Sequence, residues 1–458
     1  MKAIVCGAGQ VGFNIARSLS AQGNEVTVLD VNPDLITKIT SALDVRGIVG
    51  FASYPSVLEQ AGAADSDMII AVTFTDEVNM VACEVAHALF SVPTKIARVR
   101  AQTYLEPRWR DLFRRDSMAI DVIISPEIEV ARAIMRRLEV PGALDVIELA
   151  DGQMRVTAVR LEKDCPIAKT PLNRLAEMFP DLGVFVVGII RDGHLVVPHG
   201  EDPLLIGDEV YFVAPTDRVG QAMVAFGHRE KEARRILIIG GGNVGLFLAR
   251  QFEAEHPNVN VKIIEINRDR AAMVADQLSR TVVLHGDALD RDILEEANVA
   301  STETVVAVSN DDEVNILASL LAKRFGAHRA VTLINSSTYG PLMASLGIDV
   351  TVNPRETTVS RILEHVRRGR INAVHSLRED IAEVIEVEAL DTSAIVGRPL
   401  RDAKLPNGVR VGAIVREGKI LVPRGDTAIK AKDRVIIFAE TEMVKKVEKL
   451  FSVRFDFF

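Results

Sequence analysis

Two glycine-rich loops of the same spacing follow short apolar runs. Gly7-Ala8-Gly9-Gln10-Val11-Gly12 comes after residues 3–6, and Gly240-Gly241-Gly242-Asn243-Val244-Gly245 comes after residues 236–239. At a strand-to-helix turn, the first glycine allows the tight turn, the second lets the backbone approach a diphosphate, and the third lets the helix pack on the sheet. The N–H groups at the start of the helix then face the phosphates. Each loop is therefore predicted to bind a nucleotide.

A carboxylate stands at the end of the next apolar run in each copy. Asp30 follows residues 25–29, and Glu265 follows residues 261–264. A carboxylate at this distance accepts hydrogen bonds from the adenosine ribose and repels a 2′-phosphate. The pair therefore allows NAD(H), ATP, ADP or AMP and disfavours NADPH. A glycine-rich turn that binds nothing remains the alternative for each loop.

Other candidate residues end the later strands or begin the helices that follow them. Arg98 ends an apolar run and could pair with a phosphate, whereas the second copy has Leu333 there; a surface ion pair is the alternative for Arg98. Thr73 and Ser309 could contact the ligand or cap a helix. The predicted binding set is Gly7, Ala8, Gly9, Gln10, Val11, Gly12, Asp30, Ala52, Thr73, Phe74, Glu77 and Arg98 in the first copy, and Gly240, Gly241, Gly242, Asn243, Val244, Gly245, Glu265, Asp287, Ser309 and Glu313 in the second.

The repeat extends far beyond the loops and predicts the elements that position these residues. Apolar runs of strand length alternate with helical patterns over residues 1–120 and 233–350, which is typical of βαβ units in a parallel sheet. Each such stretch is followed by short β runs with Gly- and Asp-bearing turns. We therefore predict an α/β chain of two Rossmann-like, doubly wound lobes, each followed by a crossover helix and a small α+β module, with boundaries at 1–122, 123–228, 232–350 and 351–458.

Composition restricts the class of protein. The formal net charge of −9 argues against a nucleic-acid-binding protein, because such proteins carry a basic surface. Three widely spaced cysteines, Cys6, Cys83 and Cys165, favour a reducing compartment over a disulfide scaffold or a zinc site. No signal-peptide pattern precedes the first strand, and no apolar run reaches the roughly 20 residues of a membrane helix. We expect a cytoplasmic protein.

The residues of a familiar enzyme are not apparent. None of the four tyrosines has a lysine four positions later, and no Walker lysine follows either glycine loop. The nine histidines show no metal-ligand spacing. We therefore predict no catalytic residues and no metal site. An NAD-dependent dehydrogenase with duplicated cofactor domains remains the main alternative, and a redox-sensing transcription factor is another.

The order of modules, the two glycine loops, Asp30 and Glu265, and the repeated Asp-Glu-Val-Asn of residues 76–79 and 312–315 together resemble the RCK (regulator of potassium conductance) family, also called KTN domains. Over essentially its full length the chain is similar to the peripheral tandem-RCK subunits of Trk-type bacterial potassium uptake systems. The resemblance implies a homotetrameric cytoplasmic ring that binds NAD(H) or ATP/ADP. It also implies that the ring gates an integral membrane, potassium-translocating subunit and reaches the inner face of the membrane only through that partner.

Overall fold

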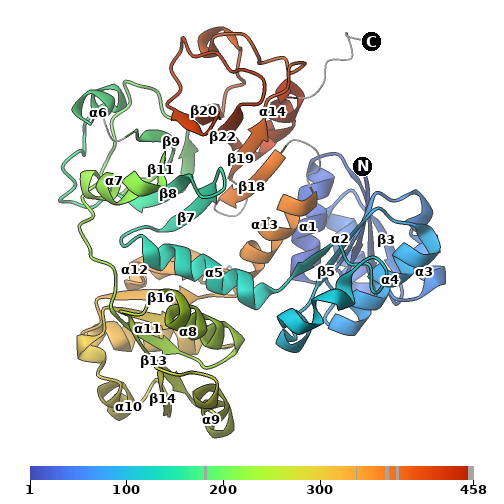
Figure 1. The fold of residues 1–458 in the computed structure, drawn as a ribbon, viewed down its shortest axis with the longest axis horizontal. Coiled ribbons are helices and arrows are strands. Elements are labelled where there is room, and N and C mark those ends of the chain that lie inside the picture. Colours follow the sequence, from blue (N-terminus) through green and yellow to red (C-terminus); the bar gives the residue numbers. More distant parts are fainter. Residues whose placement is uncertain (180–182, 337, 367–370, 378–380, 452–458) are drawn as a thin grey trace.

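The computed structural model describes residues 1–179, 183–336, 338–366, 371–377 and 381–451. Within these residues the chain forms four sheets, which are parallel, antiparallel, parallel and antiparallel in chain order (Figure 1). The first half (residues 1–228) contains the first two sheets, and the second half (residues 232–458) contains the other two. We call the parallel units the first and second Rossmann lobes and the antiparallel units the first and second C modules.

The first Rossmann lobe is a six-stranded parallel sheet in the order β3-β2-β1-β4-β5-β6. Helices cover both faces, so β4 is apolar along its whole length and β1 is apolar after its first residue. The strands are β1 (Lys2–Cys6), β2 (Glu25–Asp30), β3 (Arg46–Val49), β4 (Met68–Ala71), β5 (Thr94–Arg98) and β6 (Val122–Ile124). The helices are α1 (Gln10–Ala21), α2 (Pro33–Ala42), α3 (Pro55–Gln60) and α4 (Asp76–Phe90).

The second Rossmann lobe repeats this order as β14-β13-β12-β15-β16-β17, again with parallel pairing. The prediction of two doubly wound lobes is therefore confirmed. The strands are β12 (Arg235–Ile239), β13 (Asn260–Glu265), β14 (Val282–His285), β15 (Thr304–Ala307), β16 (Arg329–Leu333) and β17 (Val350–Val352). The helices are α8 (Asn243–Glu255), α9 (Arg268–Asp276), α10 (Arg291–Glu296), α11 (Asp312–Arg324) and α12 (Gly340–Leu346).

The two C modules also share one topology. Their sheets run β7-β8-β11-β9-β10 and β18-β19-β22-β20-β21, with antiparallel neighbours throughout. The first module comprises β7 (Asp145–Leu149), β8 (Met154–Arg160), α6 (Leu172–Met178), β9 (Phe185–Arg191), β10 (His194–Val196), β11 (Glu209–Pro215) and α7 (Val219–Ala225). The second comprises β18 (Ile371–Leu377), β19 (Ala382–Glu388), β20 (Val409–Arg416), β21 (Lys419–Leu421), β22 (Arg434–Glu440) and α14 (Val444–Phe451).

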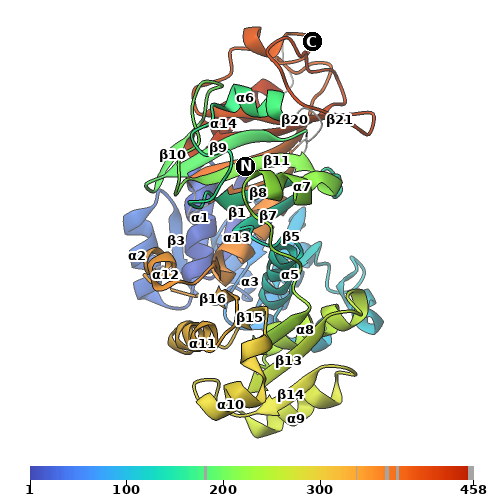
Figure 2. The same ribbon diagram turned by 90° about the vertical axis from the view of Figure 1, so that its left-hand side faces the viewer.

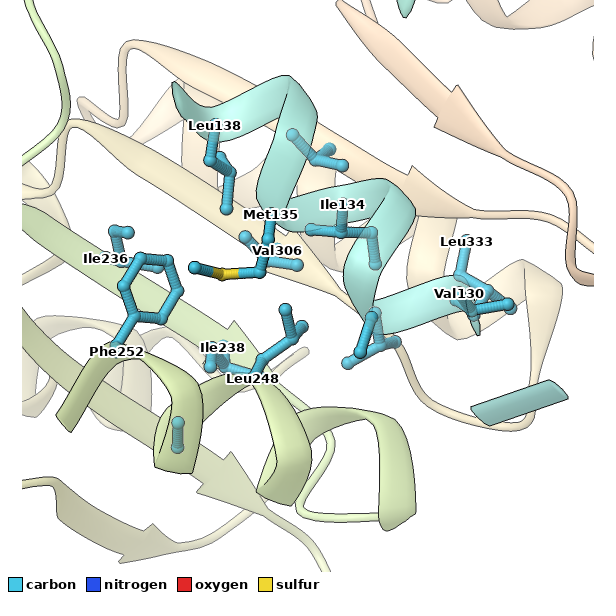
Figure 3. Packing of buried hydrophobic residues seen from close by; sticks show 14 of the residues in the cluster. Val130, Ile134, Met135, Leu138, Ile236, Ile238, Leu248, Phe252, Val306 and Leu333 are labelled. Atoms are coloured by element: carbon cyan, nitrogen blue, oxygen red, sulfur yellow. The ribbon is translucent and has the colours of Figure 1, made fainter. Parts of the chain in front are cut away.

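Two crossover helices each pack on the Rossmann lobe of the other half of the chain. Helix α5 (Pro126–Glu139) starts after β6 of the first lobe, but its apolar stripe packs on the second lobe (Figure 3). Helix α13 (Pro354–Val366) starts after β17 of the second lobe and packs on α1 and the sheet of the first. The two helices also contact one another in the middle of the molecule (Figures 1 and 2). Each Rossmann core is therefore completed by a helix from the other half of the chain. The residues of α5 in this contact include Val130, Ile134, Met135 and Leu138.

The two C modules pack against one another through apolar residues of both sheets. Gly188 of β9 faces Phe438 of β22 so closely that a Cβ atom there would lie 2.3 Å from the ring. At the edge of this contact, the Arg434 guanidinium pairs with Asp151 of the first module and with Glu386 of the second. The halves are therefore joined at two levels, by the crossover helices and by the C modules.

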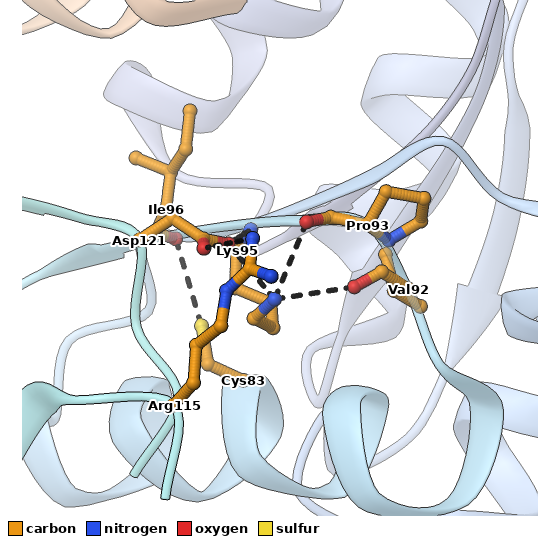
Figure 4. Close-up of polar contacts among 7 residues, drawn as sticks. All are labelled: Cys83, Val92, Pro93, Lys95, Ile96, Arg115 and Asp121. Carbon is orange, nitrogen blue, oxygen red and sulfur yellow. Dashed lines mark hydrogen bonds and ion pairs between the residues drawn. The ribbon is translucent and has the colours of Figure 1, made fainter.

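A buried ion pair lies at the amino ends of β5 and β6, at the edge of the sheet opposite the glycine loop (Figure 4). The Lys95 ammonium is 2.8 Å from the Asp121 carboxylate and donates to the Val92 and Pro93 carbonyls. Lys95 is 2% exposed, and Arg115 approaches Asp121 from the solvent side at 3.7 Å. This group links the two strands and makes no contact with the candidate site.

Candidate nucleotide-binding sites

The first glycine loop has the geometry that a phosphate ligand needs. Gly7 has a φ of +108°, in the left-handed region that favours glycine. A Cβ atom at Gly12 would lie 1.8 Å from the Gly7 carbonyl oxygen, so only glycine lets α1 pack this close to the turn. A Cβ at Gly9 would meet nothing within 4 Å, which means that the backbone there is open to a ligand. The three glycines thus have the backbone geometry that the three predicted roles need, and ligand approach at Gly9 stays a prediction.

The amino terminus of α1 points at this open backbone. Gly9 is the N-cap residue, and no side chain caps the helix. The first-turn N–H groups and the positive end of the helix dipole are therefore available to an anion. Residues 9–12 line the adjoining cavity, as a phosphate-binding turn requires.

Asp30 is held in place by the loop that it follows in sequence. Its Oδ2 accepts a hydrogen bond from the Ala8 N–H at 2.7 Å, and its Oδ1 accepts one from the Asn32 N–H at 2.8 Å. Each oxygen has a second lone pair that these two hydrogen bonds leave unused, and Asp30 lines the cavity. A ribose diol could therefore donate to a carboxylate that is already oriented.

A cavity of about 550 Å³ extends along the carboxyl edge of the first sheet, a volume in the range of small-molecule sites. Of the predicted residues, Ala8 contributes only its N–H to Asp30, and Glu77 is not part of the lining. The lining residues that sequence analysis missed include Arg100 and four residues of the second half, Asn335, Pro354, Arg355 and Thr358. The predicted residues that do line the cavity are Gly7, Gly9, Gln10, Val11, Gly12, Asp30, Ala52, Thr73, Phe74 and Arg98.

Arg98 lies inside this cavity wall. It is 7% exposed, and its Nη2 donates to the Thr73 carbonyl at 2.7 Å. Its Nε has no hydrogen-bond partner among the described residues. Burial, together with the neighbouring Arg100, lowers the pKa of Arg98 to about 10. The alternative of a surface ion pair is therefore wrong, and Arg98 is a buried cation at neutral pH.

A buried asparagine fixes the ends of β4 and β5. The Asn79 Oδ1 accepts hydrogen bonds from the N–H and the hydroxyl of Thr73, and its Nδ2 donates to the Thr73 and Arg98 carbonyls. Thr75, not Thr73, is the N-cap residue of α4. The capping alternative for Thr73 is therefore wrong, since its hydroxyl bonds Asn79. The sequence signal for this clamp is the repeated Asp-Glu-Val-Asn.

The second glycine loop repeats the backbone geometry of the first. Gly240 has a φ of +105°, and the Glu265 Oε2 accepts a hydrogen bond from the Gly241 N–H at 2.6 Å. One difference lies directly over the loop. Arg270 of α9 donates from Nε to the Gly241 carbonyl at 2.7 Å and from Nη2 to the Asn243 Oδ1 at 3.2 Å. The matching residue of the first lobe is Leu35, which lines the first cavity.

Other predicted residues of the second lobe bond within the protein. An Asp287 oxygen accepts from the Leu289 N–H at 2.9 Å, and Glu313 accepts from the Tyr339 hydroxyl. The Ser309 N–H donates to the Asn315 Oδ1, which is the counterpart of the Asn79 clamp. Asp311 caps α11, so the capping alternative for Ser309 is also wrong.

Two features are absent from the part of the chain that the structure describes. No group of three or more histidine, cysteine, aspartate or glutamate side chains there is arranged to hold a metal ion. In the same residues, no helix has the length and apolar character needed to cross a bilayer.

Comparison with known proteins agrees with the duplicated architecture. The TrkA-N domain model matches residues 3–126 and 236–354, and the TrkA-C domain model matches residues 156–227 and 384–452. The Trk system potassium uptake protein TrkA of Azorhizobium caulinodans is 52% identical over 458 residues, which cover all of both chains. The protein of the same name from Halomonas elongata is 42% identical over 462 residues, again covering all of both chains.

A solved structure shows the same fold at low sequence identity. The GsuK channel bound to NAD is 18% identical, with a TM-score of 0.59, and the match covers 98% of this chain and 78% of that one. This likeness concerns the fold, whereas the family models and the relatives cover the sequence itself. On that evidence, the chain belongs to the TrkA family of Trk system potassium uptake proteins.

Proposed function

We propose that this chain is the nucleotide-sensing regulatory subunit of a Trk-type potassium uptake system. The observation that carries the proposal is that two Rossmann lobes, each with a glycine loop, are joined by exchanged helices in a chain of the TrkA family. NAD(H) is the first candidate ligand, and ATP or ADP the second, because Asp30 and Glu265 suit a ribose with a free 2′-hydroxyl. The contacts we propose are those predicted above for the two lobes, with Arg100 added in the first.

The proposal includes a place and a set of partners. The chain would act in the cytoplasm at the inner face of the membrane, bound to the potassium-translocating subunit of the Trk type. Four copies would form a ring built from the modules 1–122, 123–228, 232–350 and 351–458. A ring of duplicated lobes suits gating, because a change of angle within each chain adds up around the ring.

The exchanged helices supply a physical route for the signal. A ligand shifts an equilibrium only if it binds the two conformations with different affinity. The first turn of α13 lines the first cavity through Pro354 and Arg355, while the rest of α13 packs on α1 and α5. A nucleotide in that cavity would therefore favour one angle between the two lobes.

The dehydrogenase alternative receives no support from the cavity. Hydride transfer to or from an alcohol or carbonyl needs a proton donor or acceptor beside the substrate, usually histidine, tyrosine or lysine. The described residues that line the cavity include none of these. Nucleotide binding without turnover is the function that this lining supports.

Calorimetric titration of the full chain with NAD, NADH, ATP, ADP and NADPH tests the proposal. We expect binding of the ligands with a free 2′-hydroxyl, and about tenfold weaker binding in Asp30→Ala, because a charge-assisted contact is lost. Asp65→Ala, an exposed aspartate away from the cavity, is the control. If none of the five ligands binds, the glycine loops are only structural. If ligands bind but small-angle scattering shows no change of shape, the gating mechanism is wrong.

A further inference from the structure

The two C modules share one topology but carry opposite charge in the segment that leads to the middle strand of each sheet. Residues 395–433, between β19 and β22, contain 9 lysines and arginines and 4 aspartates and glutamates, a formal net charge of +5. The matching residues 167–208, between β8 and β11, contain 3 and 6, a formal net charge of −3. Since the two sheets have the same strand order, the difference lies in the surface and not in the fold.

Shared backbone contacts fix which positions of the two segments match. In each module the first loop of the segment runs antiparallel to a later loop and is joined to it by an isolated bridge, Pro171 with Pro203 or Pro399 with Ala428. Two N–H groups beside the bridge donate to the same carbonyls in both modules. The donors and acceptors are Lys169 and Leu204, and Asn173 and Gly200, in the first module, and Gly397 and Ile429, and Arg401 and Gly425, in the second.

Four positions without formal charge in the first module are cationic in the second. Because residues 397–401 and 425–430 run side by side, the cations of one loop lie next to those of the other. All four are exposed, and of these only Arg401 has an ion pair among the described residues, with the exposed Asp402 at 3.8 Å. An exposed pair of this kind neutralises little. The matching pairs are Thr170 and Arg398, Asn173 and Arg401, His199 and Arg424, and Leu205 and Lys430.

These cations lie on the outer side of the second C module. Its strand β22 directs Phe438 toward the contact with the first C module and Ile437 toward the opposite face of the sheet. Ile395 and Ile429, which come from the two cationic loops, are buried on that opposite face with Ile437. The loops therefore cover the face that the first C module leaves free, in the module that forms one end of the molecule in Figure 1.

Helix α14 adds further cations to this outer side. It packs on the same apolar cluster through Val444, Val447 and Phe451, and its end is tied to the segment before Arg398 by a hydrogen bond from the Ser393 hydroxyl to the Phe451 carbonyl. The matching helix of the first module, α7, has no charged residue. We call the two cationic loops and α14 together the basic face. The lysines that α14 contributes are Lys445, Lys446 and Lys449, all exposed.

We propose that the basic face docks on the anionic phospholipid headgroups at the inner surface of the membrane. The negative potential of that surface attracts exposed lysine and arginine side chains, and mobile headgroups can adapt to cations that stand on loops. The chain outside residues 395–433 contains 45 lysines and arginines and 59 aspartates and glutamates, a formal net charge of −14. The same potential repels this remainder, so it turns the basic face toward the membrane.

This contact is additional to the one with the transporter. It rests on the proposed place of the chain at the inner face of the membrane, and it goes beyond the expectation that the chain reaches the membrane only through its partner. Because it needs neither a nucleotide nor the transporter, it can be measured on lipid vesicles alone.

Co-sedimentation of the full chain with vesicles tests the proposal. We expect binding to vesicles that contain about one third phosphatidylglycerol, and none to vesicles of phosphatidylcholine alone. Raising the salt concentration from about 0.05 M to about 0.5 M should weaken the binding about tenfold or more, because salt screens exposed charges. The combined variant Arg398→Gln, Arg401→Gln, Arg424→Gln and Lys430→Gln should also bind about tenfold more weakly or worse.

Two further variants serve as controls. Combined Lys38→Gln, Arg46→Gln, Arg110→Gln and Arg324→Gln removes the same charge from exposed positions of the Rossmann lobes and should bind within about twofold of wild type. Combined Arg398→Lys, Arg401→Lys and Arg424→Lys should likewise keep the binding, because headgroups need the charge and not the planar guanidinium group. Thermal melts followed by circular dichroism check that each variant folds.

The remaining outcomes overturn the proposal. Equal binding to neutral and anionic vesicles, no binding to either at low salt, or an equal loss in the Rossmann-lobe control excludes docking through the basic face. A glutamine variant that binds anionic vesicles normally, but binds neutral vesicles bearing the transporter poorly, would show that the face contacts a protein. Nucleotide sensing stands or fails separately, in the calorimetric titration. Should the glutamine variant not fold, the lysine variant and the salt dependence of the wild type decide.

Discussion

Arg98 illustrates the conflict between stability and binding at a single residue. Its type and place at the end of a strand were predictable from the sequence, but its burial was not, because most arginines after a strand lie at the surface. Burial of the Arg98 cation costs free energy, which the neighbouring carboxylates of Glu127 and Asp76 offset only in part. The second lobe has Leu333 at this position, in the apolar core.

We predict that Arg98→Leu makes the ligand-free protein more stable, by about 1 kcal/mol, while it weakens ATP binding. The reason is that burial, which lowers the pKa of Arg98, removes water from the charged guanidinium in the folded state. Denaturant unfolding without nucleotide, followed by calorimetry with ATP, measures both effects. Arg110→Leu, at an exposed position, serves as the control. A less stable variant would mean that the bond to the Thr73 carbonyl outweighs the cost of burial.

At the level of elements, the alternation of apolar runs and helical patterns was enough to predict both Rossmann lobes. The destination of α5 and α13 was not predictable, because an apolar stripe shows that a helix is covered but not which lobe covers it. For the same reason Arg355 and Thr358, which line the first cavity, were not among the predicted residues. Three of the lining residues that sequence analysis missed, Pro354, Arg355 and Thr358, belong to the exchanged helix α13.

Glu253 ties α8 to the segment before β14 and predicts a pH effect. Burial would raise its pKa, but hydrogen bonds from the Ser279, Arg280 and Thr281 N–H groups outweigh burial and lower the pKa from 4.5 to about 2. Because the folded pKa is the lower one, this stabilisation is present above pH 4.5 and is lost as the pH falls from 4.5 to 2.

We therefore expect Glu253→Gln to lower the melting temperature at pH 7, and the difference from wild type to shrink as the pH falls below 4.5. Thermal melts followed by circular dichroism between pH 7 and pH 3 measure this dependence. Glu255→Gln, an exposed neighbour on α8, should show no such trend. A difference that stays constant with pH would contradict the assignment to the carboxylate.

At the scale of the whole molecule, the C modules hold the two halves together on the side away from the Rossmann cavities. We predict that Gly188→Ala destabilises the chain by about 1–3 kcal/mol, because the new methyl group would overlap the buried Phe438 ring. Differential scanning calorimetry measures the loss, and Gly220→Ala in α7, where a Cβ meets nothing within 4 Å, is the control. An unchanged melting temperature would show that the two sheets can separate freely.

The exchange of α5 and α13 has a consequence for how such a molecule can change over generations. If each half were a separate chain, two identical copies would form the same pair, and every substitution would appear in both cradles at once. When the two halves are fused in one chain, this restriction no longer applies. The first Rossmann lobe can then have Arg98 while the second has Leu333 at the matching position. Because α5 and α13 cross between the halves, the two lobes stay packed together even though their residues differ. Duplication followed by fusion thus allows the two lobes of a symmetrical pair to acquire different residues while they remain paired.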